Sequence, residues 1–160
     1  AERARREPHA LVIAAKGTTP ADASPLTMLV GDRRYQAEVT LEPEGGAQAG
    51  LTLFYNERMF CGLGFDGATM ATYNYGEEQR WMRQPAVARR VRVRVQNRDH
   101  VVTFHYALDD GPWMQHPWQM ETSGMHHNVF GGFLSLKIAV HSAGAGQVRV
   151  RDFLYQGLPS

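Results

Sequence analysis

Cysteine is almost absent from this sequence: Cys61 is the only one among 160 residues. A single cysteine excludes a disulfide within the chain, and nothing in the cysteine content argues for an oxidising compartment. We therefore expect a cytoplasmic bacterial protein, with secretion as the open alternative. Because Cys61 stands in an apolar segment, we interpret it as a small core residue rather than a reactive thiol.

Long apolar runs and strong net charge are missing as well. No run approaches the roughly 20 apolar residues that a membrane-spanning helix needs, so we expect no membrane partner. The formal net charge is only +1, which gives no long-range field to attract nucleic acid. Arginines alternate with valines in the segment 91–95, and we interpret them as the solvated face of a strand.

Helical periodicity is also lacking, whereas an alternation of apolar and polar residues recurs from Leu11 to Tyr155. Short alternating segments separated by turn formers predict an all-β fold, a two-sheet antiparallel β-sandwich. A chain of this length suits one domain, which buries roughly 70% of its unfolded surface. We expect residues 11–160 to form that domain and the charged residues 1–10 to be a linker or fragment end.

The stretch 50–76 predicts three strands joined by two tight turns. Leu51 and Leu53 alternate with residues that are themselves mostly apolar, which is typical of a central strand covered on both faces. Asp66-Gly67 is a strong hairpin signal. The parity of the alternating segments predicts a core, which comprises Leu51, Leu53, Cys61, Leu63, Val93, Val95, Phe104, Leu134, Leu136 and Phe153.

A polar pair, Asn56 and Glu57, interrupts this apolar stretch, and Gly62 and Gly64 follow it. Glycines within a strand often mark the close approach of a ligand or of another backbone. One interpretation is a polar depression lined by an aromatic side chain such as that of Tyr73 or Tyr75; the other is a plain hairpin turn. Trp81, like Trp113 and Trp118, is a candidate to stack on a sugar ring, although a single tryptophan is more often core or interface.

Other chemistry has weak support in the sequence. Adjacent histidines such as His126-His127 do not make a metal signature, and we expect no metal and no cofactor. A loop such as Asp110-Gly111 supplies too few oxygens for calcium, so a turn is the better interpretation. No G-x-S-x-G elbow raises the case for a Ser-His-Asp triad, and most carboxylates occupy turns or wet strand faces.

Four segments resemble a known family: GLTLFYNERMFCGLGFDG, HVVTFHYALDDGPW, SGMHHNVFGGFLSLKIA and VRVRDFLY. They are similar to the C-terminal β-sandwich of glycoside hydrolase family 43, the β-xylosidase and α-L-arabinofuranosidase group. The resemblance runs from about Leu11 to Tyr155. It implies a concanavalin-like jelly roll, and it implies that catalysis belongs to a five-bladed β-propeller preceding this module. The family's catalytic residues therefore have no positions here, and we assign no catalytic residue.

The resemblance implies a non-catalytic module that packs on the catalytic β-propeller and contributes to the binding of xylo- or arabino-oligosaccharides. Two alternatives stay open: an autonomous carbohydrate-binding module, and a self-sufficient glycan hydrolase or lyase on a concanavalin-like fold. Within such a module, we expect His126, His127 and Asn128 to lie nearest the substrate of the parent enzyme. Neutral imidazole and carboxamide groups can donate and accept hydrogen bonds, which suits sugar hydroxyls. The other interpretation is a solvent loop whose polar side chains satisfy neighbouring backbone groups.

Overall fold

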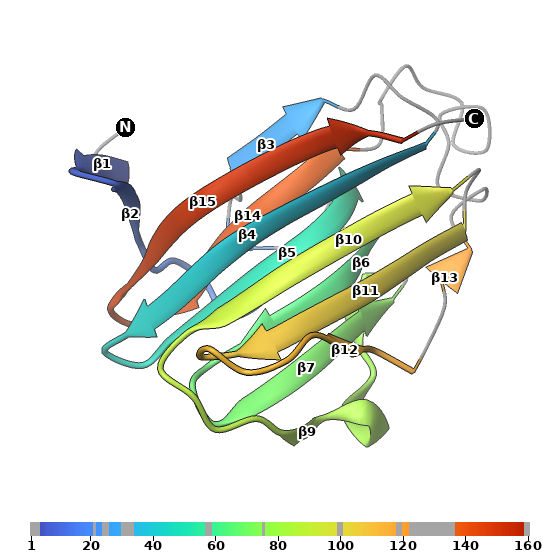
Figure 1. Ribbon diagram of the computed structural model, residues 1–160. Helices are drawn as coiled ribbons and strands as arrows, with labels where there is room; N and C mark the ends of the chain where they lie inside the picture. The colour runs from blue at the N-terminus through green and yellow to red at the C-terminus, as the bar shows by residue number, and fades with distance from the viewer. Residues whose placement is uncertain are drawn as a thin grey trace.

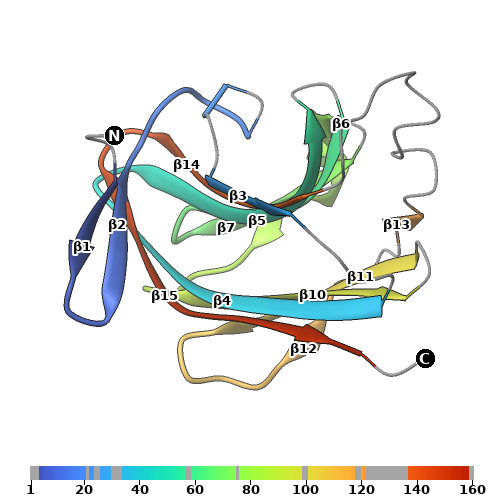
Figure 2. The same ribbon diagram turned by 90° about the horizontal axis from the view of Figure 1, so that it is seen from above.

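The strands of this protein form two antiparallel sheets that pack face to face, as Figures 1 and 2 show from two sides. The fold comes from a computed structural model, which describes residues 4–20, 22–23, 26–29, 34–56, 59–74, 76–98, 101–117, 120–121 and 137–158. In this part of the chain one sheet has eight strands and the other has seven. The all-β sandwich predicted from the sequence is confirmed.

The eight-stranded sheet has the order β1-β2-β15-β4-β10-β11-β12, with β13 also paired to β11. Its strands are β1 (Ala4–Glu7), β2 (Ala10–Ala14), β4 (Arg34–Glu44), β10 (Val91–Arg98), β11 (Val101–Leu108), β12 (Met114–Gln115), β13 (Met120–Glu121) and β15 (Gln147–Gly157). Strand β4 lies between β15 and β10, so segments that are far apart in sequence are neighbours in this sheet.

The seven-stranded sheet has the order β3-β14-β5-β6-β7-β8, with β9 also paired to β7. Its strands are β3 (Leu26–Leu29), β5 (Ala47–Asn56), β6 (Met59–Phe65), β7 (Thr69–Asn74), β8 (Glu77–Glu78), β9 (Gln84–Pro85) and β14 (Lys137–Gly144), and one 3-10 turn, η1 (Arg80–Met82), precedes β9. The stretch predicted as three strands is β5, β6 and β7, and β5 is central, between β14 and β6.

The hairpin between β6 and β7 forms where Asp66-Gly67 predicted it. The Asp66 carboxylate accepts hydrogen bonds from the backbone N–H groups of Ala68 at 2.9 Å and Thr69 at 2.7 Å. These bonds satisfy two donors that the tight turn leaves outside the ladder, which is the usual role of aspartate at this position. Gly67 has a φ of +93°, a backbone conformation that glycine adopts without steric cost.

The main core lies between the two sheets and is built by alternate residues of their strands. Seven of the predicted core residues are buried there, with at most 1% of their surface exposed: Leu51, Leu53, Cys61, Leu63, Val93, Val95 and Phe104. Leu134 and Leu136 lie outside the described residues. Burial of an apolar side chain of this size contributes about 1.5–3 kcal/mol, so the alternating pattern accounts for much of the driving force for folding.

The prediction for Phe153 is wrong, because 40% of its side chain is exposed. Arg151 lies opposite Thr40 and Leu154 lies opposite Glu38, so Asp152 and Phe153 together fill the space opposite one residue of β4. Val148 and Val150 are buried, so an unbroken alternation would turn Asp152 inward and Phe153 outward. The β-bulge interrupts this alternation and leaves Phe153 at the edge of the core rather than within it.

The first ten residues, expected to be a linker or fragment end, contain β1 and the turn that joins it to β2. Glu7 pairs with Ala10 across this turn, in which Pro8 is followed by His9 at a φ of +64°. Proline followed by a residue with positive φ is the arrangement of a type II turn. The Glu7 carboxylate also accepts a hydrogen bond from Arg149 on β15 at 3.2 Å. The hairpin therefore extends the edge of the eight-stranded sheet.

Candidate functional site

The structure does not gather the site residues predicted from the sequence into one cluster that can be described. Asn56 is the last residue of β5, opposite Met59, next to an irregularity in the β5–β6 ladder. Trp81 lies in η1 beside the other edge of the sheet. The remaining candidates lie outside the described residues: Glu57, Tyr75, His126, His127 and Asn128. Their proposed role in binding stays a prediction.

A polar cluster that was not predicted lies on the outer face of the seven-stranded sheet, the face turned away from the main core. The Gln48 carboxamide oxygen accepts hydrogen bonds from the Tyr73 hydroxyl at 3.0 Å and from His141 Nε2 at 3.1 Å. The Tyr73 and His141 rings meet edge to face, with centroids 6.2 Å apart. Three strands, β5, β7 and β14, therefore each contribute one member of this cluster.

Glycines on the neighbouring strand positions make room for these side chains. A methyl group added to Gly50, on β5, would overlap the His141 ring and the backbone oxygen of Leu63. A methyl group added to Gly64, on β6, would lie 2.9 Å from the Gln48 side chain. The glycines at 62 and 64, which the sequence suggested as signs of a close approach, thus mark an approach of the protein itself: the backbone of Leu51 and Thr52 at Gly62, and the Gln48 side chain at Gly64.

Aromatic rings continue this face beyond the polar cluster. Phe60 packs against Tyr73 with ring centroids 5.8 Å apart, and it stacks on Phe54 at 5.6 Å. Phe60, Tyr73 and Ala71 are buried, with at most 2% of each side chain exposed. The face combines neutral hydrogen-bonding groups with aromatic rings, which is the chemical composition of many sugar-binding surfaces. In this structure, however, Phe60, Tyr73 and His141 are buried in a second small core, and only Gln48 and Phe54 are partly exposed.

Burial fixes the protonation state of His141. Its ring is completely buried, and desolvation lowers its pKa from 6.5 to about 3, so the imidazole is neutral near pH 7. Because Nε2 donates to Gln48, Nδ1 is left as an acceptor, and it has no hydrogen-bond partner. The buried Thr52 hydroxyl on β5 also lacks a partner. This face therefore offers an unused acceptor and an unused hydroxyl, but no described carboxylate takes part in the cluster.

Trp81 is the most exposed aromatic side chain in the described part of the chain, with 76% of its surface accessible. The loop that carries it is held by Arg83, whose guanidinium donates to both Glu78 carboxylate oxygens at 2.8 and 2.9 Å. This pairing holds the pKa of the Glu78 carboxyl below its ordinary value and raises the pKa of Arg83. An exposed indole on an anchored loop can present its flat face to a ligand.

Trp113 is placed differently, although the sequence suggested the same role for it. Its ring is covered by two guanidinium groups from β10, that of Arg92 at 4.8 Å and that of Arg94 at 4.1 Å from the ring centroid. Cation–π contacts of this kind occupy the ring face that a sugar would use. Among the described aromatic residues, Trp81 is the better candidate for stacking on a ligand because its side chain is the most exposed.

Two further kinds of site find no support in the described residues. No three side chains of histidine, cysteine, aspartate or glutamate come together there as metal ligands. The same part of the chain holds no helix whose length and apolar character would let it cross a membrane.

A known protein-family model matches most of this chain. The family model of the beta xylosidase C-terminal concanavalin A-like domain matches residues 23–153. The chain belongs to this family. The resemblance noted from the sequence, and the concanavalin-like form of the sandwich, are thus confirmed. No curated protein sequence matches the chain.

Solved structures share the fold at low sequence identity. The chain is similar to GH43B of a Bacteroides ovatus xyloglucan PUL, with 14% identity, a TM-score of 0.78, and coverage of 98% of this chain and 35% of that one. It is also similar to the GH43 BlXynB protein from Bacillus licheniformis, with 15% identity, a TM-score of 0.75, and coverage of 93% and 33%. The chain therefore spans about a third of the length of these GH43 structures.

A third structure differs in how much of it is matched. A functionally unknown protein from Saccharomyces cerevisiae shares 13% identity with the chain at a TM-score of 0.65, and the similarity covers 98% of this chain and 92% of that one. This fold therefore also occurs as nearly the whole of a solved chain.

Proposed function

We propose that this chain is a non-catalytic module of a family 43 glycoside hydrolase, which packs on the catalytic domain and contributes to the binding of xylan- or arabinan-type substrates. The observation that carries the proposal is the family membership together with the coverage of only about a third of each GH43 structure. Glycoside hydrolysis needs two carboxyl groups that flank the scissile bond. In the described residues, the buried face of the seven-stranded sheet supplies a histidine, a glutamine and a tyrosine instead.

An activity assay on the purified chain tests this proposal. We expect no hydrolysis of an aryl xyloside or an aryl arabinofuranoside, because the chain lacks the propeller to which the resemblance assigns catalysis. The control is the same assay after adding a purified family 43 catalytic domain, which should hydrolyse the substrate. Turnover by the chain alone that disappears in a Glu57→Gln variant would contradict the proposal and favour a self-sufficient hydrolase.

The second candidate is an autonomous carbohydrate-binding module. It is favoured by the occurrence of the fold as nearly a whole chain and by the exposed indole of Trp81. Removal of an aromatic side chain on which a nucleic-acid base stacks costs about 1–3 kcal/mol, and we take this range as a guide for a sugar ring. If this module binds sugar on its own, we expect Trp81→Ala to weaken binding by a factor of about ten or more.

A calorimetric titration with xylo- and arabino-oligosaccharides separates the two candidates. Trp113→Ala is a matched control, because its ring face is already covered by arginines. Binding that Trp81→Ala removes and Trp113→Ala leaves unchanged would establish the autonomous module. Absence of any heat of binding in the isolated chain supports a module that acts only beside its catalytic domain.

We keep a cytoplasmic location of the protein as part of the proposal, with secretion as the alternative. Fractionation of the native host would decide between the two locations.

A further inference from the structure

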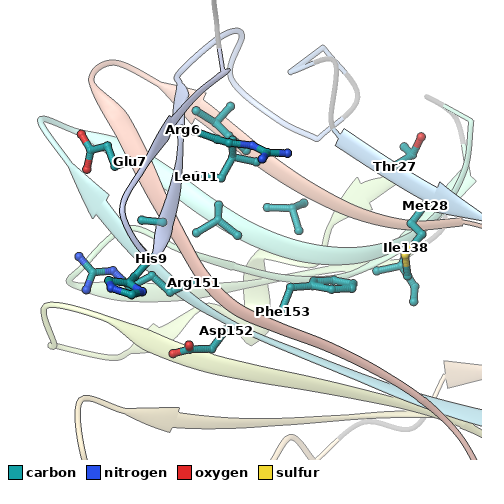
Figure 3. Close-up of a pocket in the computed structure, with 14 residues that line it drawn as sticks. Arg6, Glu7, His9, Leu11, Thr27, Met28, Ile138, Arg151, Asp152 and Phe153 are labelled. Atoms are coloured by element: carbon teal, nitrogen blue, oxygen red, sulfur yellow. The ribbon is translucent and has the colours of Figure 1, made fainter.

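A cavity of about 500 Å³ opens at the edge of the sandwich, apart from the polar cluster and from Trp81 (Figure 3). Its walls come from both sheets: β1, β2 and β15 on one side, and β3 and β14 on the other. The two sheets separate at this edge, and the β1–β2 hairpin extends one of them outward. Ligand sites in proteins commonly have volumes of this size.

The floor of the cavity is apolar and continuous with the main core. Ile13, Ile138, Val140 and Val150 line it and are at least nine-tenths buried in the fold. Leu11 and Met28 are partly buried and complete the lining. A ligand that entered this space would contact aliphatic side chains on both sheets, so its inner part must be apolar.

The rim carries an arginine that is not neutralised. Arg6 forms no ion pair within the described part of the chain, whereas the Glu7 carboxylate is engaged by Arg149. Figure 3 shows the Asp152 carboxylate and the Arg151 guanidinium directed away from the apolar lining. The charged group that remains available beside the lining is therefore the Arg6 guanidinium, because Arg6 lies opposite Leu11 in the sheet, and a guanidinium binds a carboxylate with paired hydrogen bonds.

The bulge in β15 shapes the opposite wall. It occurs between Arg151 and Leu154, and Asp152 adopts a φ of +54° there. Phe153 stands at this bulge, and its ring extends from β15 toward Ile138 across the cavity (Figure 3). Bulges often redirect a side chain next to a functional site. Here the redirected ring supplies an exposed aromatic surface to a pocket lined by aliphatic groups.

We propose that this pocket binds an amphipathic organic anion, whose apolar body lies against Ile13, Ile138 and Phe153 and whose carboxylate pairs with Arg6. Both halves of the ligand follow from the site: the buried lining selects the apolar body, and the unpaired guanidinium of Arg6 selects the negative charge. The site does not depend on the function proposed above, because it involves neither Trp81 nor the outer face of the seven-stranded sheet.

Three probes with the same alkyl body test the proposal on the purified chain: octanoate, octanol and octylammonium. Calorimetry gives each dissociation constant, and methyl-resolved NMR locates each probe through the shifts of Ile13, Ile138 and Val150. We expect octanoate to bind about tenfold more tightly than octanol, since a charge-assisted pair adds to the shared apolar contact. Octylammonium should bind most weakly.

Substitutions assign the charge recognition to the rim. Arg6→Gln should reduce the octanoate affinity to that of octanol. Arg151→Gln is the matched control, because its guanidinium is directed away from the lining, and Arg89→Gln is a second control at an exposed arginine outside the pocket. Phe153→Ala should weaken all three probes together. The proposal is overturned if the three probes bind equally, if none binds, if the shifted methyl groups lie elsewhere, or if either control has the same effect as Arg6→Gln.

Discussion

His141 shows how a single buried residue makes the stability of this fold depend on pH. In the unfolded chain a histidine takes up a proton as the pH falls through about 6.5. In the folded protein burial lowers the pKa of His141 to about 3. Between these two values the unfolded state binds more protons, so the free energy of unfolding must decrease as the pH falls.

We expect His141→Gln to remove this dependence. Below pH 6, the free energy of unfolding of the unchanged protein should fall by about 1.4 kcal/mol per pH unit more steeply than that of the variant. Urea unfolding at pH 7, 6, 5 and 4 measures both slopes. The comparison concerns slopes, so a variant that is less stable at every pH still tests the prediction. Parallel slopes would show that His141 is protonated in the folded state or exposed to solvent.

The two glycines beside the polar cluster predict substitutions of different cost. Gly50→Ala would bring a methyl group against both the His141 ring and the backbone oxygen of Leu63, and the backbone cannot move aside easily. Gly64→Ala would contact only the flexible end of Gln48. We expect Gly50→Ala to cost about 3 kcal/mol, near the upper end for overpacking, and Gly64→Ala about 1 kcal/mol.

Denaturant unfolding of the two alanine variants checks this order. In the double variant Gly64→Ala with Gln48→Ala, the steric part of the cost should largely disappear, because the contacting side chain has been removed. Gly50→Ala should have no such rescue from Gln48→Ala. Equal costs at the two glycines would mean that the strand spacing on this face is looser than the structure shows.

At the scale of elements, local patterns predicted those strands whose parity is regular along their whole length. Val93 and Val95 on β10 are buried as the alternation predicts, and the Asp66-Gly67 hairpin formed because its turn chemistry is local. The β1 strand could not be predicted in this way. It is short and charged, and it depends on a partner at β2 and on a contact with Arg149 that is more than 140 residues away.

The bulge in β15 was unpredictable for a related reason. Nothing in the alternation of Val148, Val150 and Asp152 shows that one extra residue is inserted opposite β4.

The polar cluster was missed because of the position of His141 in its strand. His141 alternates with apolar residues, which is the pattern of a residue on a solvent-exposed strand face, but in the fold its side chain is buried. The signal that could have found it was the set of glycines at 50, 62 and 64 on one face of two adjacent strands.

The different exposure of two phenylalanines predicts different costs for their removal. Phe104 is completely buried between the sheets, whereas 40% of Phe153 is exposed at the pocket. Phe104→Ala should therefore reduce the free energy of unfolding by about 3–5 kcal/mol. Phe153→Ala should reduce it by about 1 kcal/mol or less, as substitutions outside the core do. Urea denaturation of the two variants measures both values, and a large loss at Phe153 would restore the original assignment of this residue to the core.

At the scale of the whole molecule, the chain corresponds to about a third of the GH43 structures that it resembles. The fold and the family could be predicted from the sequence, because alternation, turn residues and four motif segments agree along nearly the whole chain. The function could not be predicted to the same depth. A module that acts beside another domain carries only part of its site, and the geometry of that site depends on both partners.

The last prediction therefore concerns the module within its proposed parent enzyme. If His126 and His127 bind the substrate beside the catalytic domain, replacing both with alanine should raise the Michaelis constant about tenfold, since each lost hydrogen bond contributes about 0.5–1.5 kcal/mol. The melting temperature should change little. His105→Ala, on the outer face of the eight-stranded sheet, is the control and should leave the kinetics unchanged. Steady-state kinetics and thermal unfolding of the full-length variants distinguish the two interpretations of this segment: unchanged kinetics with a large loss of stability would show that the histidines only tie the chain to its neighbours.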